Sequence, residues 1–153
     1  MTKQEKFLFF AARLFLGGIY IYAGFIKLVE PIENFRGAIA SYELLPESLI
    51  ALVSYVLPWI ELVFGFFLIL GYLAQLSALI LSVVSIAFVI LMGISYKLHG
   101  HLPASCGCFG AGGFHLSPNL VIFLDLFNCL LGLKLFFTKN HPLSLDARLD
   151  TSK

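Results

Sequence analysis

Four long apolar runs constrain the fold of this chain more than any other feature. A helix that crosses the hydrocarbon core of a bilayer needs about 20 predominantly apolar residues. Only 12% of the residues are charged, against roughly 25% in soluble proteins, and the mean hydropathy is +0.94. The apolar runs cover residues 7–29, 48–70, 73–96 and 118–137. We therefore expect an all-α, polytopic membrane protein with a single domain, residues 1–153, built as a four-transmembrane-helix bundle.

A shorter helical pattern lies between the first two runs. Ile32, Phe35, Ile39 and Tyr42 recur at the spacing of one helix face, which predicts a short interfacial helix in the first outer loop. This helix either caps the bundle beside the third loop, residues 98–117, or buries its apolar stripe in the lipid headgroups.

Lysine and arginine positions predict the orientation. The N-terminal flank and the tail at 138–153 carry Lys3, Lys6, Lys139, Arg148 and Lys153. The first loop has one arginine against four glutamates. By the positive-inside rule both termini are cytoplasmic, and in a bacterial inner (cell) membrane the first and third loops are then extracytoplasmic. The net charge of +1 gives no sign of nucleic-acid binding.

The third loop concentrates the reactive side chains. It contains Cys106 and Cys108 on either side of Gly107, whose freedom permits the bend that a disulfide over one residue requires. A bridge over so short a loop is strained, and strained disulfides exchange readily. On the extracytoplasmic side disulfides also persist. We therefore interpret Cys106 and Cys108 as an exchangeable redox pair.

Other interpretations of this loop stay open. The two thiols can be unpaired in a tight turn, or they can bind a soft metal such as Cu(I) or zinc together with histidines. The chain can also be a non-enzymatic assembly factor or membrane anchor. The histidines can instead hold a thiolate or supply a proton; they are His99, His101 and His115. Metal binding remains an alternative, and we assign no residue as a metal ligand.

Charged residues inside the spans give a second set of candidates. Arg13 and Glu61 fall at a similar depth when the helical rise is counted from the span ends. Intramembrane charges commonly pair with one another, so we expect a structural Arg13–Glu61 pair, with proton movement as the alternative role. Lys27, near the outer end of its span, is expected to reach the membrane surface or Glu30.

The fourth span contains a further carboxyl group. Asp125 lies about two turns below the outer surface, with Asn128 on the same face. Together with His115 they form our candidate proton-transfer or quinone site, because a buried carboxyl can take up and release protons. Alternatively Asp125 fixes packing through a hydrogen bond with Tyr20, Tyr22 or Ser54. Cys129, deeper in the span, has no role that we can assign.

Several stretches together carry a family resemblance that extends from Arg13 to the fourth span. The chain resembles the MauE family of DoxX-like membrane proteins. The resemblance rests on Arg13, residues 23–28 (AGFIKL), residues 42–46 (YELLP), residues 57–62 (LPWIEL) with Gly65, and residues 106–110 (CGCFG).

This resemblance implies thiol–disulfide chemistry outside the cytoplasm. A periplasmic thioredoxin-fold partner would exchange electrons with Cys106 and Cys108, supporting disulfide formation or maturation of exported proteins. Quinone is the natural lipid-soluble acceptor for a membrane thiol–disulfide oxidoreductase of this kind. The chain has one cysteine pair plus Cys129, whereas quinone-linked membrane oxidases use two pairs, so the partner must exchange with Cys106 or Cys108 directly.

Overall fold

The computed structural model describes residues 3–100 and 118–137, and within these residues all regular structure is helical. The helices are α1 (Lys3–Val29), α2 (Ile32–Ala40), α3 (Glu47–Leu70), α4 (Ala74–His99) and α5 (Pro118–Phe137). All except α2 are long and apolar enough to cross a membrane. The predicted four-helix membrane bundle with a short additional helix is therefore confirmed.

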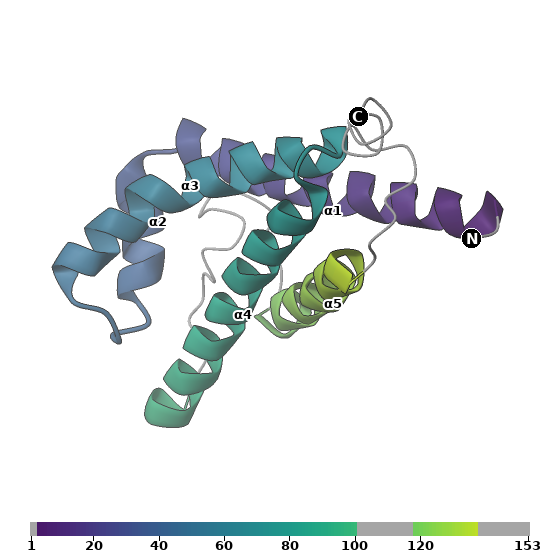
Figure 1. The fold of residues 1–153 in the computed structure, drawn as a ribbon. Coiled ribbons are helices and arrows are strands. Elements are labelled where there is room, and N and C mark those ends of the chain that lie inside the picture. The colour runs from purple at the N-terminus through teal and green to yellow at the C-terminus, as the bar shows by residue number, and fades with distance from the viewer. Residues whose placement is uncertain (1–2, 101–117, 138–153) are drawn as a thin grey trace.

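The long helices form two pairs. α1 packs along α3, α4 packs along α5, and a smaller contact joins α3 to α4. Figure 1 shows that α4 runs obliquely away from α3, so the two pairs diverge. α1 ends, α3 begins, α4 ends and α5 begins at the end where α2 lies, which we call the α2 end of the bundle. The segment 101–117 joins α4 to α5 at this end.

The short helix α2 packs on the bundle itself. Phe35, Ile39 and Tyr42 are each at most 2% exposed, and they share a hydrophobic cluster with Ile50 of α3 and Met92 of α4. Of the two predicted roles for this helix, capping the bundle is therefore the one observed. Its apolar stripe faces protein.

Glycines let α1 and α3 approach closely. A Cβ atom added to Gly24 would lie 2.7 Å from the carbonyl oxygen of Pro58, and one added to Gly17 would lie 2.8 Å from that of Gly65. Both distances are too short for any side chain. Small residues at such positions are the usual means of close helix contact in membranes, where van der Waals packing drives association.

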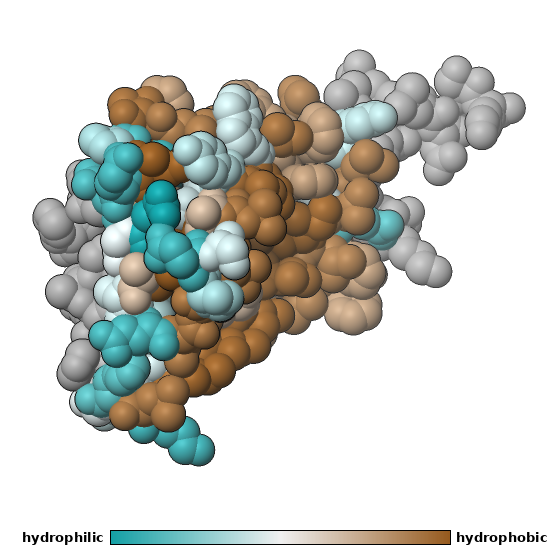
Figure 2. Space-filling view, turned by 90° about the vertical axis from the view of Figure 1, so that its left-hand side faces the viewer, coloured by the Kyte–Doolittle hydropathy of each residue, from teal (hydrophilic) through white to brown (hydrophobic). Residues whose placement is uncertain are grey.

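The outer surface of the long helices is apolar. Large side chains such as Phe7, Phe25 and Trp59 are more than half exposed, a surface that suits lipid and not water. Figure 2 looks directly onto the α2 end of the bundle, where hydrophilic side chains gather next to a continuous hydrophobic surface. The hydropathy runs correctly located the spans, but α1 starts four residues earlier than predicted and α4 extends three residues further, because hydropathy marks the lipid-facing part of a helix and not its ends.

Candidate functional site

Lys27 of α1 and Glu61 of α3 form an ion pair inside the bundle. Lys27 Nζ lies 2.6 Å from Glu61 Oε1 and 2.7 Å from Oε2, and both side chains are at most 2% exposed. The ammonium also lies 5.1 Å from the ring centre of Phe35 and 5.7 Å from that of Phe88. Removing each ion from water costs several kcal/mol, and the two-pronged contact with cation–π attraction offsets that cost.

The predicted Arg13–Glu61 pair is therefore wrong. Arg13 instead donates from Nε to the carbonyl oxygen of Leu68 at 3.0 Å and from Nη2 to that of Ile69 at 3.2 Å. These carbonyls belong to the last turn of α3, where the regular i→i−4 hydrogen bonds end and Leu68 also accepts from the backbone N–H of Gly71. A cation at a helix C-terminus is also favoured by the helix dipole. Arg13 thus caps α3, and Lys27 turns inward.

The error in pairing came from the depth count. Lys27 lies one turn or less from the end of α1, whereas Glu61 lies near the middle of α3. Gly24 of α1 lies level with Glu61, since a Cβ added to Gly24 would lie 3.2 Å from Glu61 Cβ. α1 ends five residues past this level and α3 begins 14 residues before it, so α3 begins about nine residues, roughly 13 Å, beyond the end of α1. Counting both helices from one membrane plane ignored this offset, which α2 fills by packing on the first turns of α3.

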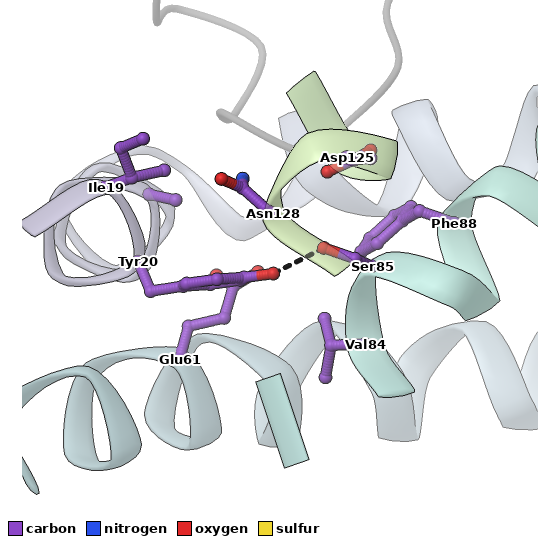
Figure 3. A pocket seen from close by; sticks show the side chains of 9 residues that line it. Ile19, Tyr20, Glu61, Val84, Ser85, Phe88, Asp125 and Asn128 are labelled. Atoms are coloured by element: carbon purple, nitrogen blue, oxygen red, sulfur yellow. Dashed lines mark hydrogen bonds between the residues drawn. The ribbon is translucent and has the colours of Figure 1, made fainter. Parts of the chain in front are cut away.

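Polar groups from all four spans surround a small cavity beside this ion pair. Asp125 and Asn128 of α5 line it together with Glu61, Tyr20 of α1 and Ser85 of α4. Figure 3 shows these side chains converging from their separate helices. Asp125 and Asn128 are 6% and 2% exposed. The structure therefore brings two of our predicted site residues together with Glu61, which we had assigned to a different, purely structural pair.

The tyrosine hydroxyl fixes two walls of the cavity. It donates to the carbonyl oxygen of Leu81 at 2.9 Å and shares a hydrogen bond with the Ser85 hydroxyl. Ser54, one of the partners we had considered for Asp125, donates instead to the carbonyl oxygen of Ile50 in its own helix. Tyr20 therefore ties α1 to α4 at the level of the cavity.

The cavity has the size of one water molecule. Its volume, counted as the space open to the centre of a water-sized sphere, is about 10 Å³, close to the minimum of roughly 10–15 Å³ that a buried water needs. Asn128 Oδ1 is buried and has no hydrogen-bond partner among the described residues. An orphaned buried acceptor costs about 1–3 kcal/mol, and a water molecule here would remove that cost.

Three charged groups come together at this level of the bundle. Glu61 and Asp125 line the cavity, and Lys27 binds Glu61 beside it. Arg13 binds carbonyls about two turns further along α3. Carboxyl groups are among the side chains that can transfer protons, so the cavity holds groups with the chemistry that our candidate site requires.

The remaining predicted residues fall into two groups, those outside the described part of the chain and those that the structure describes, His99 and Cys129. Cys106, Cys108, His101 and His115 belong to segment 101–117, outside the described residues. Among the described residues there is no cluster of metal-ligating side chains. His99 Nε2 lies 3.6 Å from a carboxyl oxygen of Glu43, which links the end of α4 to the loop after α2. Cys129 is a buried free thiol, 8% exposed.

The fold and the cavity define a class: a four-span helical membrane protein with a buried, charged cavity between its spans. The chain belongs to the MauE family, because the family model described as methylamine utilisation protein MauE matches residues 5–137. It is also similar to methylamine utilization protein MauE of Paracoccus denitrificans, with 28% identity over 108 residues. That match covers 71% of this chain but 57% of the relative, so it leaves much of the relative's length unmatched. No solved structure matches.

Sequence reasoning missed two features of this site, the inward Lys27 and the Tyr20–Ser85 contact. The sequence did contain a signal for Lys27, because the second apolar run has one internal acid, Glu61, and the first apolar run has two cations that could pair with it, Arg13 and Lys27. Choosing between them needed the offset of α3. Ser85 gave no signal, because serine inside an apolar helix commonly bonds back to its own backbone.

Proposed function

We propose that this protein is a membrane thiol–disulfide oxidoreductase that exchanges electrons between Cys106–Cys108 and a thioredoxin-fold partner outside the cytoplasm. The exchange would support disulfide formation or maturation of exported proteins. One structural observation supports the proposal: a buried cavity lined by two carboxyl groups, Glu61 and Asp125, lies beneath the α2 end of the bundle, where the segment with both cysteines is attached. Asp125 is seven residues into α5, about 10 Å below that end.

The exchange conserves electrons and protons. A thiolate of the partner attacks one sulfur of the Cys106–Cys108 disulfide, and a mixed disulfide forms. The second thiol of the partner resolves it, so the partner leaves oxidised and Cys106 and Cys108 are reduced. Reoxidation of this pair releases two electrons and two protons to a quinone, which becomes a quinol. Asp125, Asn128 and His115 are our candidates for handling these protons.

Family membership supports a membrane role connected to the process named for the relative, methylamine utilisation. The substrate need not be the same, since the chain matches 57% of that relative's length. The proposal therefore concerns the reaction and not the identity of the exported protein.

The decisive experiment measures the redox state of Cys106 and Cys108 in intact cells. A membrane-impermeant alkylating reagent is applied before and after mild reduction, with Cys129→Ala removing the third thiol. We expect no labelling before reduction and labelling from outside afterwards. Single variants Cys106→Ala and Cys108→Ala should then trap a partner as a mixed disulfide, and the double variant should not. Free labelling without reduction would refute a resting disulfide, and labelling only after the cytoplasm is opened would refute the orientation.

A further inference from the structure

The polar cavity between the four spans has walls that suit a water molecule and not empty space. Its volume of about 10 Å³ accommodates the centre of one water, and buried waters typically make about three hydrogen bonds. Genuinely empty cavities in proteins are lined by apolar side chains. Here three helices contribute oxygen-bearing side chains that converge in Figure 3: Glu61, Ser85, Asp125 and Asn128.

Asn128 gives the strongest indication of an occupant. Its Oδ1 atom is buried and has no hydrogen-bond partner among the described residues, and the residue is 2% exposed. An amide oxygen accepts hydrogen bonds and cannot donate them, so its partner must be a donor that fits the cavity. The Tyr20 hydroxyl is not that donor, because it donates to the carbonyl oxygen of Leu81. A water molecule fits, and it has a second O–H group to donate elsewhere.

Glu61 can accept this second hydrogen bond. Its two carboxylate oxygens contact the Lys27 ammonium at 2.6 and 2.7 Å. A carboxylate has about four lone-pair positions, so positions remain for a water in the cavity that Glu61 lines. The Asp125 side chain lines the same small cavity from α5. One water molecule therefore lies within reach of both carboxyl groups.

We propose that one water molecule fills this cavity and connects Asp125 with Glu61, which makes Glu61 a second proton-transferring residue. This inference rests on the proposed function, because the protons are those that Cys106 and Cys108 release when the pair is reoxidised. A protonated Asp125 gives its proton to the water, and the water gives one of its own to Glu61. In each step one O–H bond breaks and one forms, no electron moves, and the water is restored.

The ion pair with Lys27 positions Glu61 for this transfer. The ammonium binds both carboxylate oxygens and lies over the rings of Phe35 and Phe88, so the carboxyl group is held at the cavity wall. An acid–base group acts when it is held within hydrogen-bond reach of the proton, directly or through one water. A purely structural clamp between α1 and α3 would need no polar cavity beside it.

A crystal structure of the full-length protein in a lipid mesophase, at a resolution that shows ordered waters, tests the site. We expect one water within hydrogen-bond distance of Asn128 Oδ1 and of carboxyl oxygens of Glu61 and Asp125. In Ala23→Val, whose added methyl groups enter the cavity that Ala23 lines, this water should be absent. An empty wild-type cavity, a metal ion in place of the water, or a water that contacts Asn128 alone would overturn the proposal.

Reoxidation kinetics test the transfer itself. Ala23→Val should slow reoxidation of a reduced Cys106–Cys108 pair in membranes by about tenfold or more and should raise the solvent isotope effect, the ratio of the rates in ordinary and heavy water. A loosened fold would lower the rate without raising this ratio. Ala87→Val makes the same substitution at an exposed position of α4 and should change neither quantity. An Ala23→Val variant with an unchanged isotope effect would overturn the transfer.

A second variant tests Glu61 directly. Lys27→Met/Glu61→Gln removes the carboxyl group together with its ammonium, so no buried charge is left without its partner. This variant should also reoxidise the pair more slowly, by about tenfold or more. A folded double variant with the wild-type rate would restrict Glu61 to a structural role and overturn the proposal.

The two kinds of measurement separate this inference from the proposed function. The crystallographic test does not use the thiols, so Cys106→Ala/Cys108→Ala should contain the same water. If cells show the expected disulfide but the cavity is empty, the water-linked transfer is wrong and the thiol–disulfide function stands. If the water is present and the cysteines are free in cells, the water site stands and the proposed function is wrong.

Discussion

Arg13 and Lys27, two buried cations of α1, are each stabilised by hydrogen-bonding partners, and the partners differ. Arg13 binds the carbonyl oxygens at the end of α3, whereas Lys27 binds the Glu61 carboxylate with both oxygens. An ion left without its partner in a low-dielectric interior keeps the full cost of its desolvation. Removing one member of the Lys27–Glu61 pair should therefore cost more than removing both.

We predict that Lys27→Met lowers the free energy of unfolding by about 3–5 kcal/mol, the range for a buried charge that loses its partner. The double variant Lys27→Met/Glu61→Gln should recover most of that loss. Thermal unfolding in detergent measures both. The control is Arg36→Met, which breaks an exposed pair with Glu47 and should change stability by less than about 1 kcal/mol. A single variant no less stable than the double would contradict the pairing.

Asp125 gives a prediction at the same scale that concerns activity. Asp125→Asn keeps the shape of the side chain but cannot take up and release a proton, so reoxidation of a reduced Cys106–Cys108 pair in membranes should slow by roughly a hundredfold or more, as for the loss of a general acid–base group. Unfolding temperature should change little. Glu33→Gln removes an exposed carboxyl on α2 and serves as the control. If Asp125→Asn leaves the rate of reoxidation unchanged, the carboxyl group serves packing and not proton transfer.

Helices are the scale at which the sequence was most informative. The spans and the short helix followed from apolar runs and helical spacing, because a membrane requires both length and hydropathy. Which helices pair did not follow. The α1–α3 contact depends on glycines at matching heights, Gly17 with Gly65 and Gly24 with Pro58, and matching heights require the offset between helices that a hydropathy pattern does not contain.

Two glycines of α1 test this packing with the same substitution. Gly24→Ala places a Cβ 2.7 Å from the Pro58 carbonyl oxygen, so α1 and α3 must move apart, at a cost of about 1–3 kcal/mol. In Gly18→Ala the added Cβ meets nothing within 4 Å, so the better helix propensity of alanine should stabilise the protein by up to about 1 kcal/mol. Thermal unfolding of the two variants compares them. Equal effects would contradict the close α1–α3 contact.

Over the whole molecule, the sequence predicted the class of protein, but the buried cavity only in part. Asp125 and Asn128 were recognised from their position in a span, because polar residues inside a membrane are energetically costly and usually have a function. Their neighbours Lys27, Glu61, Tyr20 and Ser85 come from three other helices, and no local pattern joins residues so far apart in the chain. The cavity is a product of the tertiary fold.

The orientation in the membrane is the remaining whole-molecule prediction. Four spans of alternating direction place the start of α1 and the end of α5 at one end, opposite α2. The positive-inside rule places the end with the start of α1 and the end of α5 in the cytoplasm. The opposite end, with α2 and the attachment points of segment 101–117, then lies outside. In a variant without Cys106, Cys108 and Cys129, Asn34→Cys on the exposed face of α2 should react with an impermeant maleimide in intact cells. Thr2→Cys should react only after lysis. The opposite pattern would place the redox pair on the reducing side of the membrane, where a resting disulfide does not persist, and would remove the physical basis for oxidation of exported proteins.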